Sequence, residues 1–259
     1  MKTTEQVLKK LSGLVPPEFL THFPDLPDKI TASILYGSCA RGDYTQDSDV
    51  DILCISDHTQ QSINTDRISV SFYTLPQILT GVGSLFGYHL RRDGIILTDP
   101  TGTLQDALEN FSTFDFPLLQ RKIFSLSQIF TTPEYDLSKF LPGLLREARY
   151  FLRSYLYGKS IYEGRPCFSL NELAKRHHNE NLATLLSSHR RPPSYDEYDT
   201  CLDFLEAHIG RFPPSKHGSL EATVVNEWGT DSDLYTVAYL ALGVTGQCGD
   251  YEEVRKILL

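Results

Sequence analysis

Residues 34–55 read Ile-Leu-Tyr-Gly-Ser-Cys-Ala-Arg-Gly-Asp-Tyr-Thr-Gln-Asp-Ser-Asp-Val-Asp-Ile-Leu-Cys-Ile. An apolar run from Thr31 to Tyr36 comes before Gly37, and a second apolar stretch follows Asp49. Short apolar runs that end at turn residues are typical of buried strands. The segment therefore predicts two strands joined by a polar loop, with polar side chains gathered at the strand ends.

Gly37 and Ser38 stand at the end of the first predicted strand. Glycine allows a tight turn and a close approach of the backbone to a ligand. The serine hydroxyl and the exposed amides of such a turn can face an anion. The turn therefore suits a phosphate group.

Asp49 and Asp51 lie two positions apart on the second predicted strand, Asp49–Ile55. Positions i and i+2 of a strand project from the same face, so the two carboxylates converge while Val50 and Ile52 pack on the other side. Neighbouring carboxylates repel each other unless a cation lies between them, and Mg²⁺ is expected because it favours oxygen ligands and bridges carboxylates to phosphates. The pair predicts phosphoryl or nucleotidyl transfer. The alternative is a glycine turn followed by a solvated acidic strand edge.

The flanking sequence predicts an α/β arrangement around these two strands. Residues 67–73 alternate between polar and apolar positions, and Ile95–Thr98 is a short apolar run, so both are expected to be strands. Helices are expected over residues 5–14 and over Pro76–Leu90, the second with an interruption near Gly81.

From about residue 104 onward the periodicity of the apolar residues is helical. Capping boxes are expected to begin helices at Ser169 and Ser194. The other expected helices cover Leu118–Phe130, Leu137–Tyr157, Ser232–Leu242 and Tyr251–Leu258. The chain is therefore expected to divide into an α/β domain at residues 1–110 and an all-α domain at residues 111–259.

The composition limits the classes of function. The 259 residues are 41% hydrophobic and 22% charged, which is ordinary for a globular protein with a buried core. The net charge of −9 gives no general attraction to nucleic acid or to an anionic membrane. The five widely spaced cysteines predict neither a disulfide framework nor a zinc site, and no apolar run approaches the roughly 18 residues of a membrane span. We expect a cytoplasmic protein with no membrane contact.

The run Gly37–Gly42, followed by Ser48-Asp49-Val50-Asp51-Ile52, resembles the signature of the nucleotidyltransferase superfamily that includes DNA polymerase beta. It looks especially like the small bacterial branch of minimal and aminoglycoside nucleotidyltransferases, and the stretch from His89 to Asp99 is similar to a segment that follows the catalytic core in that branch. The resemblance implies an α+β fold, with an N-terminal nucleotidyltransferase domain around a short mixed sheet and a C-terminal helical bundle.

The resemblance also assigns roles to residues of the motif. Gly37 and Ser38 are expected on the triphosphate, with Arg41 and Ser48 also beside the nucleotide. The catalytic pair Asp49 and Asp51 is expected to hold Mg²⁺, with ATP as the nucleotide substrate.

One departure from the family pattern concerns the general base. Family members usually carry a third carboxylate on the following strand, and Ser69 stands at that position here, with Asp66 just before the strand. Without a base, activation of an acceptor hydroxyl is weaker by roughly 10²–10⁴-fold. Three interpretations follow: the helical domain supplies the base, the acceptor needs none, or the protein is a catalytically weak relative that mainly binds nucleotide.

Arg146, Arg149 and Arg153 are spaced by three and four along one predicted helix and share a face. They are expected either to help hold the triphosphate or the acceptor, or to form a solvated helix face. Glu147 lies on a neighbouring face and is the candidate replacement for the missing catalytic base, by analogy with two-domain antibiotic nucleotidyltransferases.

The function expected from these residues is transfer of a nucleoside monophosphate, AMP from ATP, onto an acceptor hydroxyl with release of pyrophosphate. The partners are a nucleoside triphosphate and an acceptor that is a small molecule or a protein, with a tRNA end less favoured by the acidic charge. The sequence does not specify the oligomeric state. The alternative is an inactive or weak nucleotide-binding or partner-binding module, for example in a toxin–antitoxin or defence system.

Overall fold

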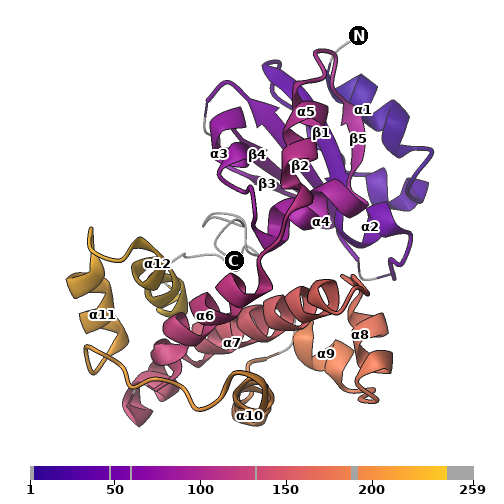
Figure 1. The fold of residues 1–259 in the computed structure, drawn as a ribbon. Coiled ribbons are helices and arrows are strands. Elements are labelled where there is room, and N and C mark those ends of the chain that lie inside the picture. The colour runs from indigo at the N-terminus through magenta and orange to yellow at the C-terminus, as the bar shows by residue number, and fades with distance from the viewer. Residues whose placement is uncertain (1–2, 47, 59, 132, 188–191, 244–259) are drawn as a thin grey trace. The chain divides into compact units, whose positions relative to one another are not determined.

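The computed structural model describes residues 3–46, 48–58, 60–131, 133–187 and 192–243 (Figure 1). The described residues form two compact units, which divide between Phe114 and Asp115. The predicted helix Tyr251–Leu258 lies outside the described residues. None of the described helices combines the length and the apolar character that crossing a membrane requires.

The first unit contains a five-stranded sheet and the helices that cover it. Its elements are α1 (Thr3–Leu11), η1 (Pro17–Leu20), β1 (Ile30–Tyr36), α2 (Gly37–Arg41), β2 (Val50–Ser56), β3 (Ile63–Asn64), β4 (Ile68–Tyr73), α3 (Leu75–Leu79), α4 (Leu85–Asp93), β5 (Ile95–Thr98), α5 (Thr103–Glu109) and η2 (Asn110–Ser112).

The strand order in the sheet is β3-β4-β2-β1-β5. The pair β2–β4 is parallel, whereas β1–β2, β1–β5 and β3–β4 are antiparallel. The expected short mixed sheet is therefore confirmed. The predicted second strand begins one residue too early, because Asp49 precedes β2.

Alternating side chains of each strand enter two separate apolar layers. Val50 and Ile52 of β2 are fully buried on one face, in a core shared with α1. Leu53 and Ile55 face the other layer, which α3, α4 and α5 cover with buried side chains that include Leu90 and Leu104. The sheet is thus buried on both faces, and its polar residues are confined to the strand ends and to a few buried hydroxyls.

The second unit is helical, as expected. Its elements are α6 (Phe116–Leu126), η3 (Ser127–Phe130), α7 (Glu134–Tyr162), α8 (Leu170–Arg176), α9 (Leu182–Leu186), α10 (Tyr195–Ile209), α11 (Leu220–Glu227) and α12 (Ser232–Ala241).

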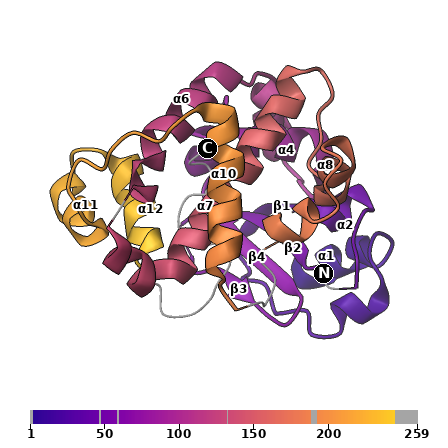
Figure 2. The same ribbon diagram turned by 90° about the horizontal axis from the view of Figure 1, so that it is seen from below.

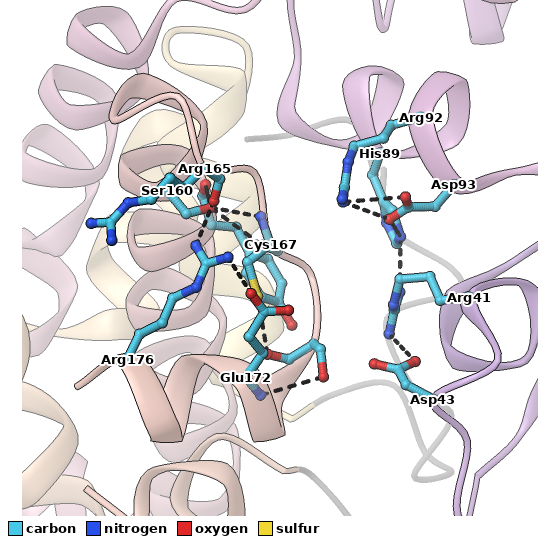
Figure 3. A network of polar contacts seen from close by, with 12 residues as sticks. Arg41, Asp43, His89, Arg92, Asp93, Ser160, Arg165, Cys167, Glu172 and Arg176 are labelled. Atoms are coloured by element: carbon cyan, nitrogen blue, oxygen red, sulfur yellow. Dashed lines mark hydrogen bonds and ion pairs between the residues drawn. The ribbon is translucent and has the colours of Figure 1, made fainter. Parts of the chain in front are cut away.

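The long helix α7 is the centre of this unit and packs against α6, α9, α10 and α12 (Figure 2). Gly143 lets α12 approach closely, because a Cβ there would lie 2.1 Å from the carbonyl oxygen of Ala241. A polar contact joins the end of α7 to the segment before α8: the Ser160 hydroxyl accepts the Cys167 amide at 3.0 Å (Figure 3).

The two predicted capping boxes differ from the structure. Ser169 accepts the amide of Glu172 at 3.4 Å, but the Glu172 carboxylate pairs with Arg176 rather than reaching back to the cap. The box predicted at Ser194 is wrong, because its side chain makes no cap hydrogen bond. The Glu197 carboxylate, which should have completed that box, is paired with an arginine of α7.

Candidate functional site

Gly37 and Asp51 are in direct contact at the point where β1 ends. Tyr36 pairs with Asp51 across the antiparallel strands, and the chain then turns into α2 with Gly37 at φ 75°. A Cβ on Gly37 would lie 2.4 Å from Oδ2 of Asp51. The carboxylate therefore occupies the space that a side chain would fill, and both the left-handed φ and this contact require glycine.

The negative charges of Asp49 and Asp51 both influence the pKa of one group, the Cys39 thiol. Cys39 is a buried residue of α2, and its thiol donates to the backbone carbonyl of Asp49 at 3.3 Å. Burial and then the negative charges of Asp51 and Asp49 raise the pKa of the Cys39 thiol to about 12. The thiol therefore stays protonated at neutral pH.

The loop that leads to Asp49 is held by hydrogen bonds within itself and to the start of β4. The Ser48 hydroxyl accepts the amide of Thr45 at 2.8 Å, and the Ser48 amide donates to the Thr45 carbonyl at 3.1 Å. Arg67, just before β4, donates to the carbonyl of Gln46 and accepts the amide of Val50 on its own carbonyl at 2.7 Å. Ser48 therefore supports the loop, while its predicted role in nucleotide binding stays a prediction.

Ser69 is the partner of Asp51 in the parallel pairing of β2 with β4, and Asn64 of β3 is in turn the partner of Ser69. Residues paired in this way project from the same face of a sheet. A polar row of Asp51, Ser69 and Asn64 therefore runs across three strands. The position next to Asp51 carries a hydroxyl, and Asp66 lies before β4 with an exposed side chain.

Residues 17–83 match the nucleotidyltransferase domain family. The matched segment of the first unit is therefore similar to nucleotidyltransferase domains, in line with the predicted resemblance to the polymerase beta-like superfamily. The matched residues run from η1 through β4 and α3, so they include the Gly37–Ser38 turn and both Asp49 and Asp51. The resemblance of the motif to this superfamily is thereby confirmed.

A solved structure is also similar, a nucleotidyltransferase-like protein from Exiguobacterium sibiricum 255-15. It shares 14% sequence identity and a TM-score of 0.29, with 88% of this chain and 80% of that chain covered. A TM-score of that size does not establish a common fold. The comparison with curated proteins finds no match.

Arg41 closes α2 of the nucleotidyltransferase domain and enters a polar network with α4 (Figure 3). Its Nη1 lies 3.1 Å from Nε2 of His89, and its Nη2 lies 3.1 Å from Oδ1 of Asp43. Asp93, one turn after His89, lies 3.5 Å from the same Nε2 and also pairs with Arg92. Burial raises the pKa of the Asp93 carboxyl, and the charges of Arg92 and Arg41 oppose that shift.

His89 and Asp93 were not among the residues predicted for the site. Their spacing of four on a helix is a signal for side-chain contact, but nothing in the sequence pairs that helix with Arg41, which lies 48 positions earlier. Cys39 was likewise missed, because a lone cysteine inside the motif gives no sign that its thiol lies beside both carboxylates.

Glu147, the candidate base, lies on α7 of the second unit and is 3% exposed. Burial raises the pKa of its carboxyl to about 7, although the adjacent Arg146, whose Nε lies 3.1 Å away, lowers it. Arg146 also donates to the carbonyl of Leu240, and the buried Arg149 donates to the carbonyl of Leu185. Both arginines thus tie α7 to other helices of the same unit, and Arg149 is not part of a solvated face.

Asp49 and Asp51 are the two carboxylates predicted to hold a metal ion. Across the described residues, no group of three or more His, Cys, Asp and Glu side chains is arranged to hold a metal ion. Asp49 and Asp51 nevertheless fit the requirements of Mg²⁺, which takes one or two protein carboxylates and completes its shell with water and substrate phosphates. A side chain at position 37 would collide with the Asp51 carboxylate, and glycine avoids that collision.

Proposed function

We propose that this chain is a Mg²⁺-dependent nucleotidyltransferase that moves AMP from ATP onto an acceptor hydroxyl and releases pyrophosphate. The observation that supports it best is the contact between Gly37 and Asp51, with Asp49 beside them, inside the segment that matches the nucleotidyltransferase domain family. Here a turn suited to phosphate and a pair of carboxylates suited to a cation meet at one strand end.

Asp49 and Asp51 would hold the metal ion through their carboxylate oxygens. When bound, Mg²⁺ supplies positive charge that stabilises the negative charge developing on the phosphates during transfer. The chain itself positions the substrate: the Gly37 backbone permits a close approach, Ser38 offers a hydroxyl to a phosphate oxygen, and Arg41 supplies a positive charge.

The acceptor hydroxyl must lose its proton as it attacks the α-phosphorus. Ser69 is next to Asp51 but is neutral and cannot act as a strong base, so it is suited to orienting the acceptor by a hydrogen bond. We keep Glu147 as the proposed base because a carboxyl with a pKa of about 7 is well matched to proton transfer at neutral pH. Replacing it by glutamine should then lower transfer with little effect on ATP binding.

The acceptor is proposed to be a small molecule or a protein side chain rather than a tRNA end. A protein with a net charge of −9 lacks the general electrostatic attraction that supplies most non-specific binding of nucleic acids. Transfer to each acceptor class should be compared at the same ionic strength, because the tRNA reaction is the one that salt would weaken most.

The test is transfer of label from α-³²P-ATP with Mg²⁺ and a panel of acceptors. Asp49→Asn and Asp51→Asn should each abolish measurable transfer, whereas Asp57→Asn, an exposed acid just after β2, should leave it unchanged. If both site variants retain full transfer, the site is wrongly assigned. If no acceptor class is ever labelled although ATP binds, the transferase proposal fails.

The pairing of Asp51 with Ser69 favours a second candidate function, a module that binds nucleotide or a partner without transfer. Such a protein would bind a non-hydrolysable ATP analogue through Asp49 and Asp51 and show no turnover. Equal nucleotide affinity with and without any acceptor, together with no labelled product, would support this function over the first.

A further inference from the structure

The Arg41 guanidinium is held between a neighbouring loop and a separate helix. Asp43 lies on the loop that follows α2, whereas His89 projects from α4 (Figure 3). The Arg41 side chain is only 17% exposed, and its Nε is buried without a hydrogen-bond partner among the described residues. A side chain held at both terminal nitrogens is restricted to few orientations.

This guanidinium belongs to the same small region as the two catalytic carboxylates. The positive charge of Arg41 lowers the pKa of the Cys39 thiol, while the charges of Asp51 and Asp49 raise it. Arg41 also ends the short helix α2 that begins at Gly37, so the phosphate-binding turn and the guanidinium belong to one rigid element. The orientation of Arg41 is consequently a property of the site and not only of the surrounding surface.

The chemistry of the contact fixes the state of His89. A guanidinium has donors only, so Nε2 of His89 must be the acceptor and the proton of the neutral ring must be on Nδ1. Asp93 lies 3.5 Å from the same Nε2 and would favour a protonated ring, but Arg92 pairs with Asp93 at 3.2 Å and offsets that charge. Asp93 thus has Arg92 as a partner besides His89, which leaves Nε2 to accept from Arg41.

A neutral acceptor has a specific advantage at this position. An arginine beside carboxylates tends to form charge-assisted pairs with them, which would use the oxygens that a cation needs. The imidazole adds a second, uncharged contact to Arg41 beside its ion pair with Asp43. The guanidinium is thereby held in one direction, from which it can face an anionic group such as the phosphates of a nucleotide.

We propose that His89 is a positioning residue for nucleotide binding, which holds the Arg41 guanidinium in the direction that contacts the triphosphate. This inference rests on the proposed function, in which Arg41 binds the nucleotide. Asp93 and Arg92 support it indirectly, through the tautomer of His89.

The inference is tested by the affinity for a non-hydrolysable ATP analogue with Mg²⁺, measured by calorimetry on the full chain. His89→Leu should weaken binding about tenfold. His89→Gln should bind within about twofold of wild type, because its amide oxygen can accept from Arg41 in place of Nε2. Arg41→Ala should weaken binding by at least as much as His89→Leu.

A double-mutant cycle separates positioning from general destabilisation. In the Arg41→Ala background, the change His89→Leu should cause no further loss of affinity, because there is no guanidinium left to position. Additive losses in the cycle would overturn the proposal, and so would a His89→Gln protein that binds as weakly as His89→Leu. Thermal melts of each variant identify any that fail to fold, and the glutamine variant keeps the test decisive if leucine is not tolerated.

Failure of this inference is distinguishable from failure of the proposed function. If wild type binds no nucleotide, the proposed function itself fails. If wild type binds and Arg41→Ala binds equally well, only the positioning role is overturned.

Discussion

Ser69 is the direct partner of Asp51 in the parallel ladder between β2 and β4. Their side chains project from the same sheet face, at the strand end where Gly37 begins α2. An acidic residue at position 69 would therefore stand beside Asp51 without any change in the backbone. One substitution at position 69 could therefore supply the third carboxylate that the resemblance led us to expect.

In the Glu147→Gln background, which lacks the proposed base, Ser69→Asp should increase the rate of nucleotidyl transfer onto a hydroxyl acceptor at least about tenfold, since a placed general base is worth roughly 10²–10⁴-fold. Ser69→Asn, which adds similar bulk without a charge, should give no increase. The measurement is the initial rate of label transfer from α-³²P-ATP at saturating acceptor. A Ser69→Asp protein that binds ATP normally and transfers no faster would show that proton removal is not the missing element.

The sequence predicted the parts of the site that depend on local pattern. Alternation and short apolar runs predicted the four longer strands, and the i, i+2 spacing placed Val50 and Ile52 in the core opposite the aspartates, as observed. The two-residue strand β3 was missed because Ile63–Asn64 is too short to show a period. A period of two also contains no information about which strand is the neighbour, so the pairing of Asp51 with Ser69 needed the structure.

Contacts between distant segments account for the remaining differences. The box predicted at Ser194 fails because Glu197 is used by Arg149, which lies 48 positions away. Arg41 and His89 are also separated by 48 positions, so no local sequence pattern pairs them. Local propensity favours a cap or a solvated charge, but a buried partner elsewhere in the chain offers a stronger, charge-assisted bond.

Gly37→Ala should destabilise the protein more than Gly42→Ala, although both glycines have nearly the same φ, 75° and 76°. The shared cost of a left-handed residue is about 1–2 kcal/mol. At Gly37 the added Cβ also meets Oδ2 of Asp51 at 2.4 Å, whereas at Gly42 nothing lies within 4 Å. Chemical denaturation of the two variants measures the difference.

The additional cost at Gly37 is expected to be about 1–3 kcal/mol, as for overpacking in a core. Adding Asp51→Ala should remove that additional cost and leave only the backbone cost. If Gly37→Ala and Gly42→Ala are equally stable, the contact between Gly37 and Asp51 does not constrain the turn.

Arg149→Met should destabilise the helical unit by about 3–5 kcal/mol, because it removes the guanidinium that pairs with Glu197 and donates to the Leu185 carbonyl. The Arg149 side chain is 9% exposed and its Nη2 lies 2.5 Å from Oε2 of Glu197. The matched control is Glu221→Gln, which breaks the exposed pair with Lys139 and should cost less than about 1 kcal/mol. Urea denaturation of both variants gives the comparison, and equal effects would contradict the structural role of Arg149.

Glu147→Gln should change how stability depends on pH. Burial raises the pKa of the Glu147 carboxyl from its ordinary value of 4.5 to about 7. Between those pH values the folded state keeps a proton that the unfolded state has released, so the free energy of unfolding of wild type falls as pH rises. The slope is about 1.4 kcal/mol per pH unit within this window, and the effect is constant above the folded pKa.

Glutamine has no proton to lose, so this contribution is absent from the variant, while its amide oxygen can still accept from Arg146. The stability of Glu147→Gln relative to wild type should therefore rise from pH 5 to pH 7 and then level off. Far-UV circular dichroism follows urea unfolding of the helical unit at each pH. Parallel pH profiles for the two proteins would mean that Glu147 titrates normally, and would also remove the physical reason for proposing it as the base.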